Sequence, residues 1–343
     1  MVTPAEIPFQ QVIDSLLDEK TIFHPRFLYR LSDLNEAELA LLERNWMKIL
    51  PRRRQTLLED IEEIGDSDLV LNFEGVGQIA LQDENPQVRL LAVRVLAEYE
   101  APRFIPNFQQ MAKQDEEEQV RAAAAFALGP FVYLGELEQL PEKTARQIED
   151  DLLEVVLGED TPLVRRRALE ALSFSGREEV SPIIEWAFTS GDLGWLETAL
   201  FAMGRSANEA WTSQVITMLD HAKPAIRTEA VSAAGELEIH EAVQKLIDLL
   251  KDDHDDVRFA AIWALSQIGG EGVREVLEEM LEDVNDEEEA DMIEMALDNL
   301  AFTEDLQPFS LFGFPEPDED SEELDEFYDD DLYDTEDDED IEV

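Results

Sequence analysis

A pattern of small and aliphatic residues recurs along the chain every 31 or 32 residues, with one longer step, and it constrains the fold more than any other feature. In each copy an apolar anchor is followed by alanine four positions later and by small or aliphatic residues seven and eight positions later. These positions share one face of a helix. One such helix cannot bury its apolar stripe alone, so the repetition predicts stacked units. The anchors, spaced 32, 44, 31, 31 and 31 residues apart, are Val88, Val120, Val164, Trp195, Ile226 and Val257.

Each unit is expected to hold two helices, as the stretch 255–283 indicates most clearly. A helix around the anchor Val257 is followed by Gly269 and Gly270, and then by a second apolar stripe between Val273 and Leu281. Because glycine adopts a positive φ without steric cost, the glycine pair predicts a tight turn between two helices.

An arginine follows five of the six anchors, and a proline suited to the first turn of a helix precedes three of them by two positions. The resulting pattern, Pro-x-Val-Arg-x-x-Ala-x-x-Ala-Leu-Gly, resembles HEAT repeats, and its short period is most similar to the PBS-lyase-type HEAT-like repeats. The resemblance covers roughly residues 50–300. It implies an all-α fold, a right-handed α-solenoid of about eight HEAT-like helix pairs.

The recurring arginines predict a row of guanidinium groups that bond carboxylates and carbonyls between adjacent units. A row of anion-binding arginines is the alternative, although acidic residues crowd the same turns. The arginines that follow the anchors are Arg89, Arg121, Arg165, Arg227 and Arg258.

Changes in composition divide the chain into three expected parts. Residues 1–36 form an N-terminal helical cap segment, residues 37–305 form the repeat solenoid, and residues 306–343 form an acidic disordered tail. The longer step between anchors indicates an insertion at about residues 130–143, which we expect to be a loop. Its large apolar residues, Phe131 and Tyr133 among them, either bind a partner or pack locally over the solenoid edge.

The charge of the chain is strongly negative, with 82 acidic residues against 26 basic ones. Residues 275–343 contain 32 acids and no base. Such a field repels nucleic acid and anionic membranes and attracts a protein or peptide of basic character. Solubility and adaptation to salt are the alternative explanations. No stretch approaches the roughly 20 apolar residues of a membrane span, and the N-terminus lacks the features of a signal peptide, which predicts a cytoplasmic protein.

Two kinds of enzyme contain similar repeats, and we expect neither activity here. Deoxyhypusine hydroxylases hold an iron pair with several His-Glu dipeptides, whereas His240-Glu241 is the one such dipeptide in this sequence. Phycobilin lyases attach bilins to partner cysteines, and no motif marks that activity. The sequence therefore predicts no catalytic, cofactor-binding or metal-binding residues. An enzyme of the phycobilin-lyase-like class remains an alternative that is based on the fold alone.

The helix that begins at each anchor lines the concave side in HEAT-like stacks, and positions three and six beyond the anchor should point away from the core. The sixth position places the large aromatic residues Phe126, Phe201 and Trp263 on this wall. Aromatic side chains are typical anchors of a binding interface, although they could instead be buried between units. Basic candidates for the same surface are Arg94, Arg166 and Arg167.

Taken together, these features predict a non-catalytic protein-binding scaffold or adaptor that uses its concave face. A second hypothesis is chaperone-like capture of basic proteins by the tail, because residues 316–343 hold 18 acids in 28 positions with apolar residues among them.

Overall fold

The computed structural model describes residues 7–67, 70–284 and 286–310, and every regular element in these ranges is helical. The expected all-α solenoid is confirmed. Of the predicted cap and tail, residues 1–6 and 311–343 lie outside the described residues. The α-helices are α1 (Phe9–Leu17), α2 (Glu36–Trp46), α3 (Pro51–Ser67), α4 (Glu74–Ala80), α5 (Pro86–Ala97), α6 (Ile105–Gln114), α7 (Glu118–Phe126), α8 (Gly129–Glu136), α9 (Glu142–Leu157), α10 (Pro162–Leu172), α11 (Val180–Thr189), α12 (Leu193–Arg205), α13 (Thr212–Met218), α14 (Pro224–Glu236), α15 (Val243–Leu249), α16 (Asp255–Ile268), α17 (Val273–Asp283) and α18 (Glu287–Ser310). Short 3-10 turns lie at Pro25–Phe27, Tyr29–Leu31, Pro102–Phe104, Glu209–Trp211 and His240–Ala242.

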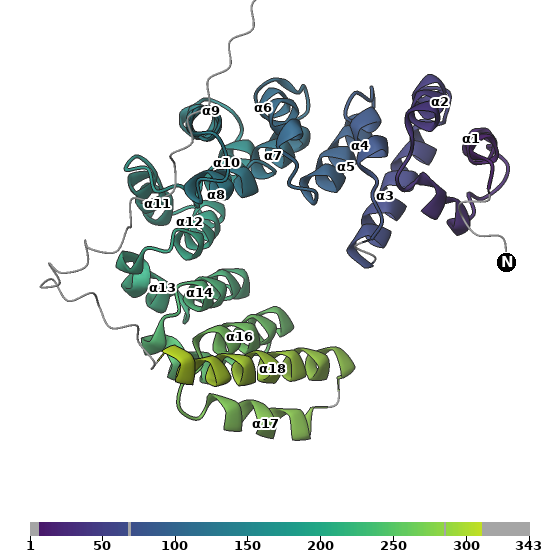
Figure 1. Ribbon diagram of the computed structural model, residues 1–343. Coiled ribbons are helices and arrows are strands. Elements are labelled where there is room, and N and C mark those ends of the chain that lie inside the picture. Colours follow the sequence, from purple (N-terminus) through teal and green to yellow (C-terminus); the bar gives the residue numbers. More distant parts are fainter. Residues whose placement is uncertain (1–6, 68–69, 285, 311–343) are drawn as a thin grey trace, which may run out of the picture.

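The helices form two rows in a curved stack (Figure 1). The helices that carry the anchors pack side by side in an inner row, which lines the concave side of the curve as expected. The partner helix of each pair lies in an outer row. The described residues therefore contain eight successive pairs, to which α1 and α8 are added. The inner row consists of α3, α5, α7, α10, α12, α14, α16 and α18, and the outer row of α2, α4, α6, α9, α11, α13, α15 and α17.

Small residues set the spacing of the inner row. The alanines four positions after the anchors are fully buried, as the pattern predicted. The ninth position is glycine in three copies, Gly129, Gly204 and Gly235, and there the next inner helix comes close with the alanine at its own seventh position. A Cβ on Gly204, for example, would lie 3.0 Å from the Cα of Ala233. Alanine and glycine thus permit tight packing from one unit to the next.

The row of arginines joins the units, as the sequence predicted. Arg227 donates two hydrogen bonds, of 2.9 and 2.8 Å, to the carboxylate of Asp252 in the next unit and one of 2.9 Å to the carbonyl of His221. Arg165 departs from this pattern because its guanidinium lies 5.5 Å from the ring centroid of Trp195, the one aromatic anchor. The two hydrogen bonds of Arg227 to one carboxylate recur in the pairs Arg89–Asp115 and Arg121–Asp160, whereas Arg258 donates a single hydrogen bond, of 3.0 Å, to Glu289.

The insertion is not a loop, and the prediction of a loop at residues 130–143 is wrong. Helix α8 occupies its first half and packs against α9 and α10. Phe131 is only 1% exposed, and its ring centroid lies 6.4 Å from that of Phe108 in α6. Burial of this aromatic face stabilises a helix that two glycines, Gly129 and Gly135, would otherwise disfavour.

No helix within the described ranges has both the length and the apolar character needed to cross a membrane.

Candidate protein-binding surface

The concave wall brings together two of the three predicted aromatic residues. The ring centroids of Phe126 in α7 and Phe201 in α12 lie 6.3 Å apart, although α10 stands between their helices in the row. Contact across a whole helix is possible because Glu170, at the equivalent position of α10, is only 6% exposed. Glu170 accepts a hydrogen bond of 2.8 Å from the hydroxyl of Thr198, which holds its carboxylate down between the helices.

Exposure differs among the aromatic residues of the wall. Phe126 is 44% exposed and Trp263 is 38% exposed, whereas Phe201 is half-buried. Trp263 in α16 lies over Gly235 of α14, where a Cβ would come within 2.6 Å of the indole ring. The wall thus presents an aromatic pair in its middle and a separate indole nearer its C-terminal end.

An arginine side chain of the same protein packs over each phenylalanine ring of the pair. The guanidinium of Arg167 lies 5.5 Å from the centroid of Phe126 and forms an ion pair with Glu170. The guanidinium of Arg205 lies 5.5 Å from the centroid of Phe201 and 3.1 Å from a carboxylate oxygen of Glu236. A cation over a ring and beside a carboxylate is therefore a repeated arrangement on this face.

The other predicted residues occupy different surroundings. Arg94 is exposed and its Nε lies 2.7 Å from a carboxylate oxygen of Glu62. Arg166 is only partly exposed because its guanidinium packs against α12 where Gly194 has no side chain. Phe131 belongs to the core, which is the local packing that the sequence left open as an alternative. Tyr133 is 48% exposed, with its ring centroid 5.6 Å from that of Phe174.

A group of carboxylates on the same wall was not predicted. Burial, reinforced by the negative charges of Glu197, Glu170 and Glu236, raises the pKa of Glu229 in α14 to about 7, and Arg167 opposes this shift. Burial also raises the pKa of Glu236. The signal was present in the sequence, because Glu229 and Glu170 stand three and six positions after their anchors, where residues point away from the core.

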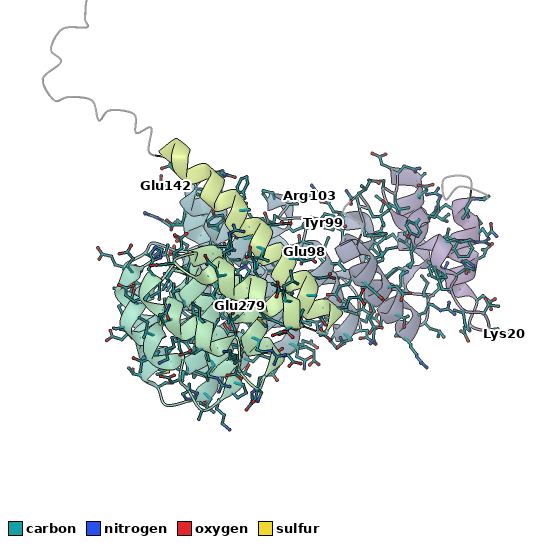
Figure 2. All side chains as sticks on the ribbon, turned by 90° about the horizontal axis from the view of Figure 1, so that it is seen from below. Lys20, Glu98, Tyr99, Arg103, Glu142 and Glu279 are labelled. Carbon is teal, nitrogen blue, oxygen red and sulfur yellow. The ribbon has the colours of Figure 1, made fainter. Side chains whose placement is uncertain are left out.

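A hollow on the concave side lies between the C-terminal halves of α3, α5 and α7. It is a groove of about 960 Å³ whose lining includes the predicted residues Arg94 and Phe126. Glu98 and Tyr99, at the end of α5, also line it, and both are marked in Figure 2. We call this hollow the α5–α7 groove.

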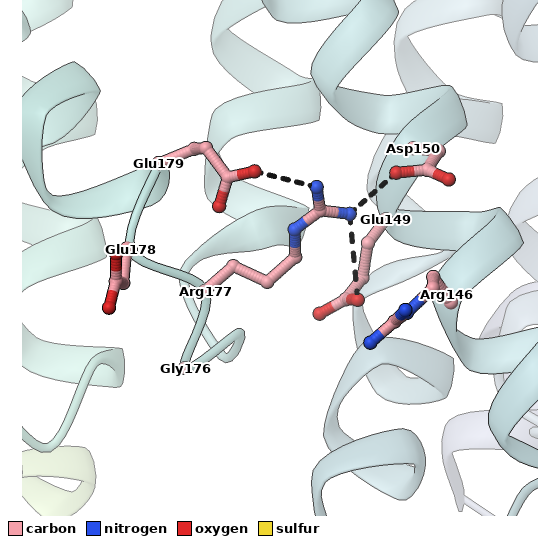
Figure 3. A pocket seen from close by; sticks show the side chains of 7 residues that line it. All are labelled: Arg146, Glu149, Asp150, Gly176, Arg177, Glu178 and Glu179. Carbon is pink, nitrogen blue, oxygen red and sulfur yellow. Dashed lines mark hydrogen bonds and ion pairs between the residues drawn. The ribbon is translucent and has the colours of Figure 1, made fainter.

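A second hollow, of about 870 Å³, lies between α9 and the segment that joins α10 to α11 (Figure 3). Its central cation, Arg177, contacts Glu179 at 2.8 Å, Asp150 at 2.6 Å and Glu149 at 3.9 Å. The hydrogen bonds to Glu179 and Asp150 raise the pKa of Arg177 further. These acids already neutralise the guanidinium of Arg177. The side chains that line the hollow therefore form a salt-bridge network that joins two units.

The described residues contain no group of three or more histidine, aspartate or glutamate side chains placed to hold a metal ion.

The fold and the concave wall define a helical-repeat protein. The chain belongs to the HEAT-repeat family, because a model of HEAT repeats matches residues 73–142, 195–258 and 212–298, together about half of the sequence. A search of curated proteins found no significant match.

Several solved structures resemble the chain in fold. The Escherichia coli protein YibA is 18% identical with a TM-score of 0.43, and the match covers 83% of this chain and 98% of YibA. The CpcE–CpcF complex of phycocyanin lyase from Nostoc is 17% identical with a TM-score of 0.44, covering 66% of this chain and 94% of that one. Human deoxyhypusine hydroxylase is 21% identical with a TM-score of 0.34, covering 78% and 97%. Similarity at these levels concerns the fold alone.

Proposed function

We propose that this protein is a non-catalytic scaffold whose concave wall holds a protein or peptide segment of basic character. The observation that carries the proposal is the aromatic pair of an exposed Phe126 and a half-buried Phe201, set among the carboxylates of Glu170, Glu229 and Glu236 on the inner row. Aromatic rings that solvent reaches at the centre of a concave surface suit the anchoring role that a few aromatic residues have in interfaces.

The net charge of the chain supports a partner segment of basic character. The formal net charge of the chain is −56, so its field draws in a basic segment and repels an acidic one. The arginines beside the pair do not reverse this sign, because Arg167 and Arg205 are each bound to a carboxylate of the chain itself. A partner that brings its own cations therefore meets a chain whose net charge stays strongly negative.

The test is binding of a fluorescein-labelled octapeptide of alternating lysine and arginine, measured by fluorescence anisotropy at near-physiological salt. Phe201→Ala and Trp263→Ala leave the charge of the protein unchanged, and each is expected to weaken binding about tenfold, as removal of an interface anchor does. The control is Leu157→Ala, a residue 67% exposed at the end of α9 in the outer row. Affinity that is the same in all four proteins would overturn the proposal.

Capture by the C-terminal acids is a second candidate, favoured by the 18 acids within residues 316–343. Comparison of the full chain with one that ends at residue 315 separates the two. Loss of peptide binding on truncation, with no effect of Phe201→Ala, would support the tail. Binding that survives truncation and depends on Phe201 supports the concave wall.

A further inference from the structure

The pattern of small residues on the inner row is interrupted in α5. In α5 the seventh and ninth positions after the anchor are Val95 and Ala97, the bulkiest pair among the six copies. In other copies alanine and glycine at these positions let the next helix approach closely. Both Val95 and Ala97 line the α5–α7 groove, together with Ala127 of α7. The groove therefore lies where larger side chains replace the alanine and glycine of other copies.

The interior of the groove is apolar and aromatic. Ile61 and Phe73 form part of its lining, and the rings of Tyr99 and Phe126 stand at its sides. The backbone N–H of Phe73 donates a hydrogen bond of 2.8 Å to the hydroxyl oxygen of Tyr99, which fixes that ring in place. Burial raises the pKa of Tyr99, so the hydroxyl stays neutral. The aliphatic part of a long side chain that enters the groove would therefore contact an apolar surface that is already formed.

The rim of the groove is acidic. Four glutamates line it, and Arg94 is the one basic residue among the lining residues, so their formal charge is −3. Arg94 is already bound to Glu62, with 2.7 Å between the nitrogen and the oxygen. Glu63 and Glu98 are exposed and close to the apolar lining. Complementarity in charge therefore selects a cation and rejects an acidic segment such as the C-terminal tail. The four glutamates are Glu59, Glu62, Glu63 and Glu98.

The same wall shows how an arginine fits beside a ring and an acid. Arg167 lies over Phe126 while paired with Glu170, and Arg205 lies over Phe201 while paired with Glu236. A planar guanidinium stacks on an aromatic face and bonds a carboxylate in two places, whereas an ammonium group acts as a point charge. Aromatic rings and carboxylates are likewise adjacent in the α5–α7 groove, where the chain supplies no unpaired arginine.

We propose that the α5–α7 groove binds an arginine side chain of the partner segment. The aliphatic stem packs on the apolar lining, and the guanidinium lies between the aromatic rings and the carboxylates of Glu63 and Glu98. The inference rests on the proposed function and names the side chain that the wall selects.

The experiment compares two fluorescein-labelled octapeptides, alternating lysine–arginine and all-lysine, with the full-length protein. Both carry the same charge, so the ratio of their affinities reports recognition of the guanidinium rather than of the general field. Wild type is expected to prefer the arginine peptide about fivefold. The double variant E63Q/E98Q is expected to lose this preference. The matched control E278Q/E279Q removes two exposed acids from α17 in the outer row and should keep it.

The outcomes separate this inference from the proposed function. Absence of an arginine preference in wild type, or its survival in E63Q/E98Q, overturns the groove site. If Phe201→Ala and Trp263→Ala still weaken both peptides in that case, the scaffold proposal stands. Equal thermal unfolding of E63Q/E98Q and wild type checks that the groove variant remains folded.

Discussion

A Cβ placed on Gly235 of α14 would lie 2.8 Å from the Cα of Ala264 in α16 and 2.6 Å from the ring of Trp263. Two inner helices thus meet backbone to backbone, and the glycine is required by this contact rather than by its own conformation. Glycine also stands nine residues after the anchor at Gly129 and Gly204. A methyl group at Gly235 would push apart two units that are otherwise spaced by alanine.

We therefore expect Gly235→Ala to destabilise the protein by about 1–3 kcal/mol, the usual cost of overpacking. The control is Gly65→Ala in α3, where a Cβ would meet nothing within 4 Å. Since alanine favours a helix interior, this change should raise stability by roughly 0.5–1 kcal/mol. Urea unfolding measures both. Equal effects of the two substitutions would show that helix propensity, and not close approach, governs these glycines.

The arginine row makes a second prediction about stability. Arg227→Met removes the two-pronged bond to Asp252 and leaves that carboxylate, which is largely buried, without its cation. Loss of one partner of such a pair should cost about 2–3 kcal/mol near pH 7. Arg146→Met is the control, because Arg146 is exposed and lies 3.9 Å from Glu142. Exposed pairs of this kind contribute little, so its effect on urea unfolding should be under about 0.5 kcal/mol.

Acid should weaken the same row. The hydrogen bond from Arg121 lowers the pKa of Asp160, and that from Arg227 lowers the pKa of Asp252. An aspartate with a lowered folded-state pKa adds stability above its unfolded pKa of about 3.9 and loses it as the pH falls through the folded value. The difference in unfolding free energy between wild type and Arg227→Met should therefore narrow as the pH falls below about 4. A difference that stays constant down to pH 2 would contradict the pairing.

Much of the fold could be predicted from the sequence, because the residues that join neighbouring units stand at fixed distances from each anchor. The alanine four residues after each anchor and the arginine one residue after five of the six recur in the chain and in the structure alike. Helix α8 was missed because Phe131 is buried by a residue of another unit, Phe108, which no local pattern reveals.

The candidate surface was predicted only in part. Position six after each anchor identified Phe126 and Phe201 as wall residues, but their contact depends on the burial of Glu170 between them. The contact between Phe126 and Phe201 depends on the curvature of the stack and on the rotamer of Glu170. Neither can be predicted from the spacing of residues in the sequence. The α5–α7 groove was missed although Ala97 occupies a position that is glycine in three other copies.

The carboxylate of Glu229 should oppose folding at alkaline pH. Burial and the neighbouring Glu197, Glu170 and Glu236 raise its pKa from 4.5 to about 7, against the opposing charge of Arg167. Between these two values the folded protein holds a proton that the unfolded chain has lost, so stability falls as the pH rises through about 7. Glu229→Gln removes this cost and should stabilise the protein by about 1–3 kcal/mol at pH 8, while changing little at pH 4.

Urea unfolding at both pH values measures the effect, with Glu278→Gln in α17 as a control that removes the same charge from an exposed site. A stabilisation common to both variants would show that relief of the general net charge explains it. Stabilisation confined to Glu229→Gln at high pH would place the repulsion in the concave wall, where a bound cation would relieve it. For the same reason, a saturating basic octapeptide should stabilise wild type more at pH 8 than at pH 5.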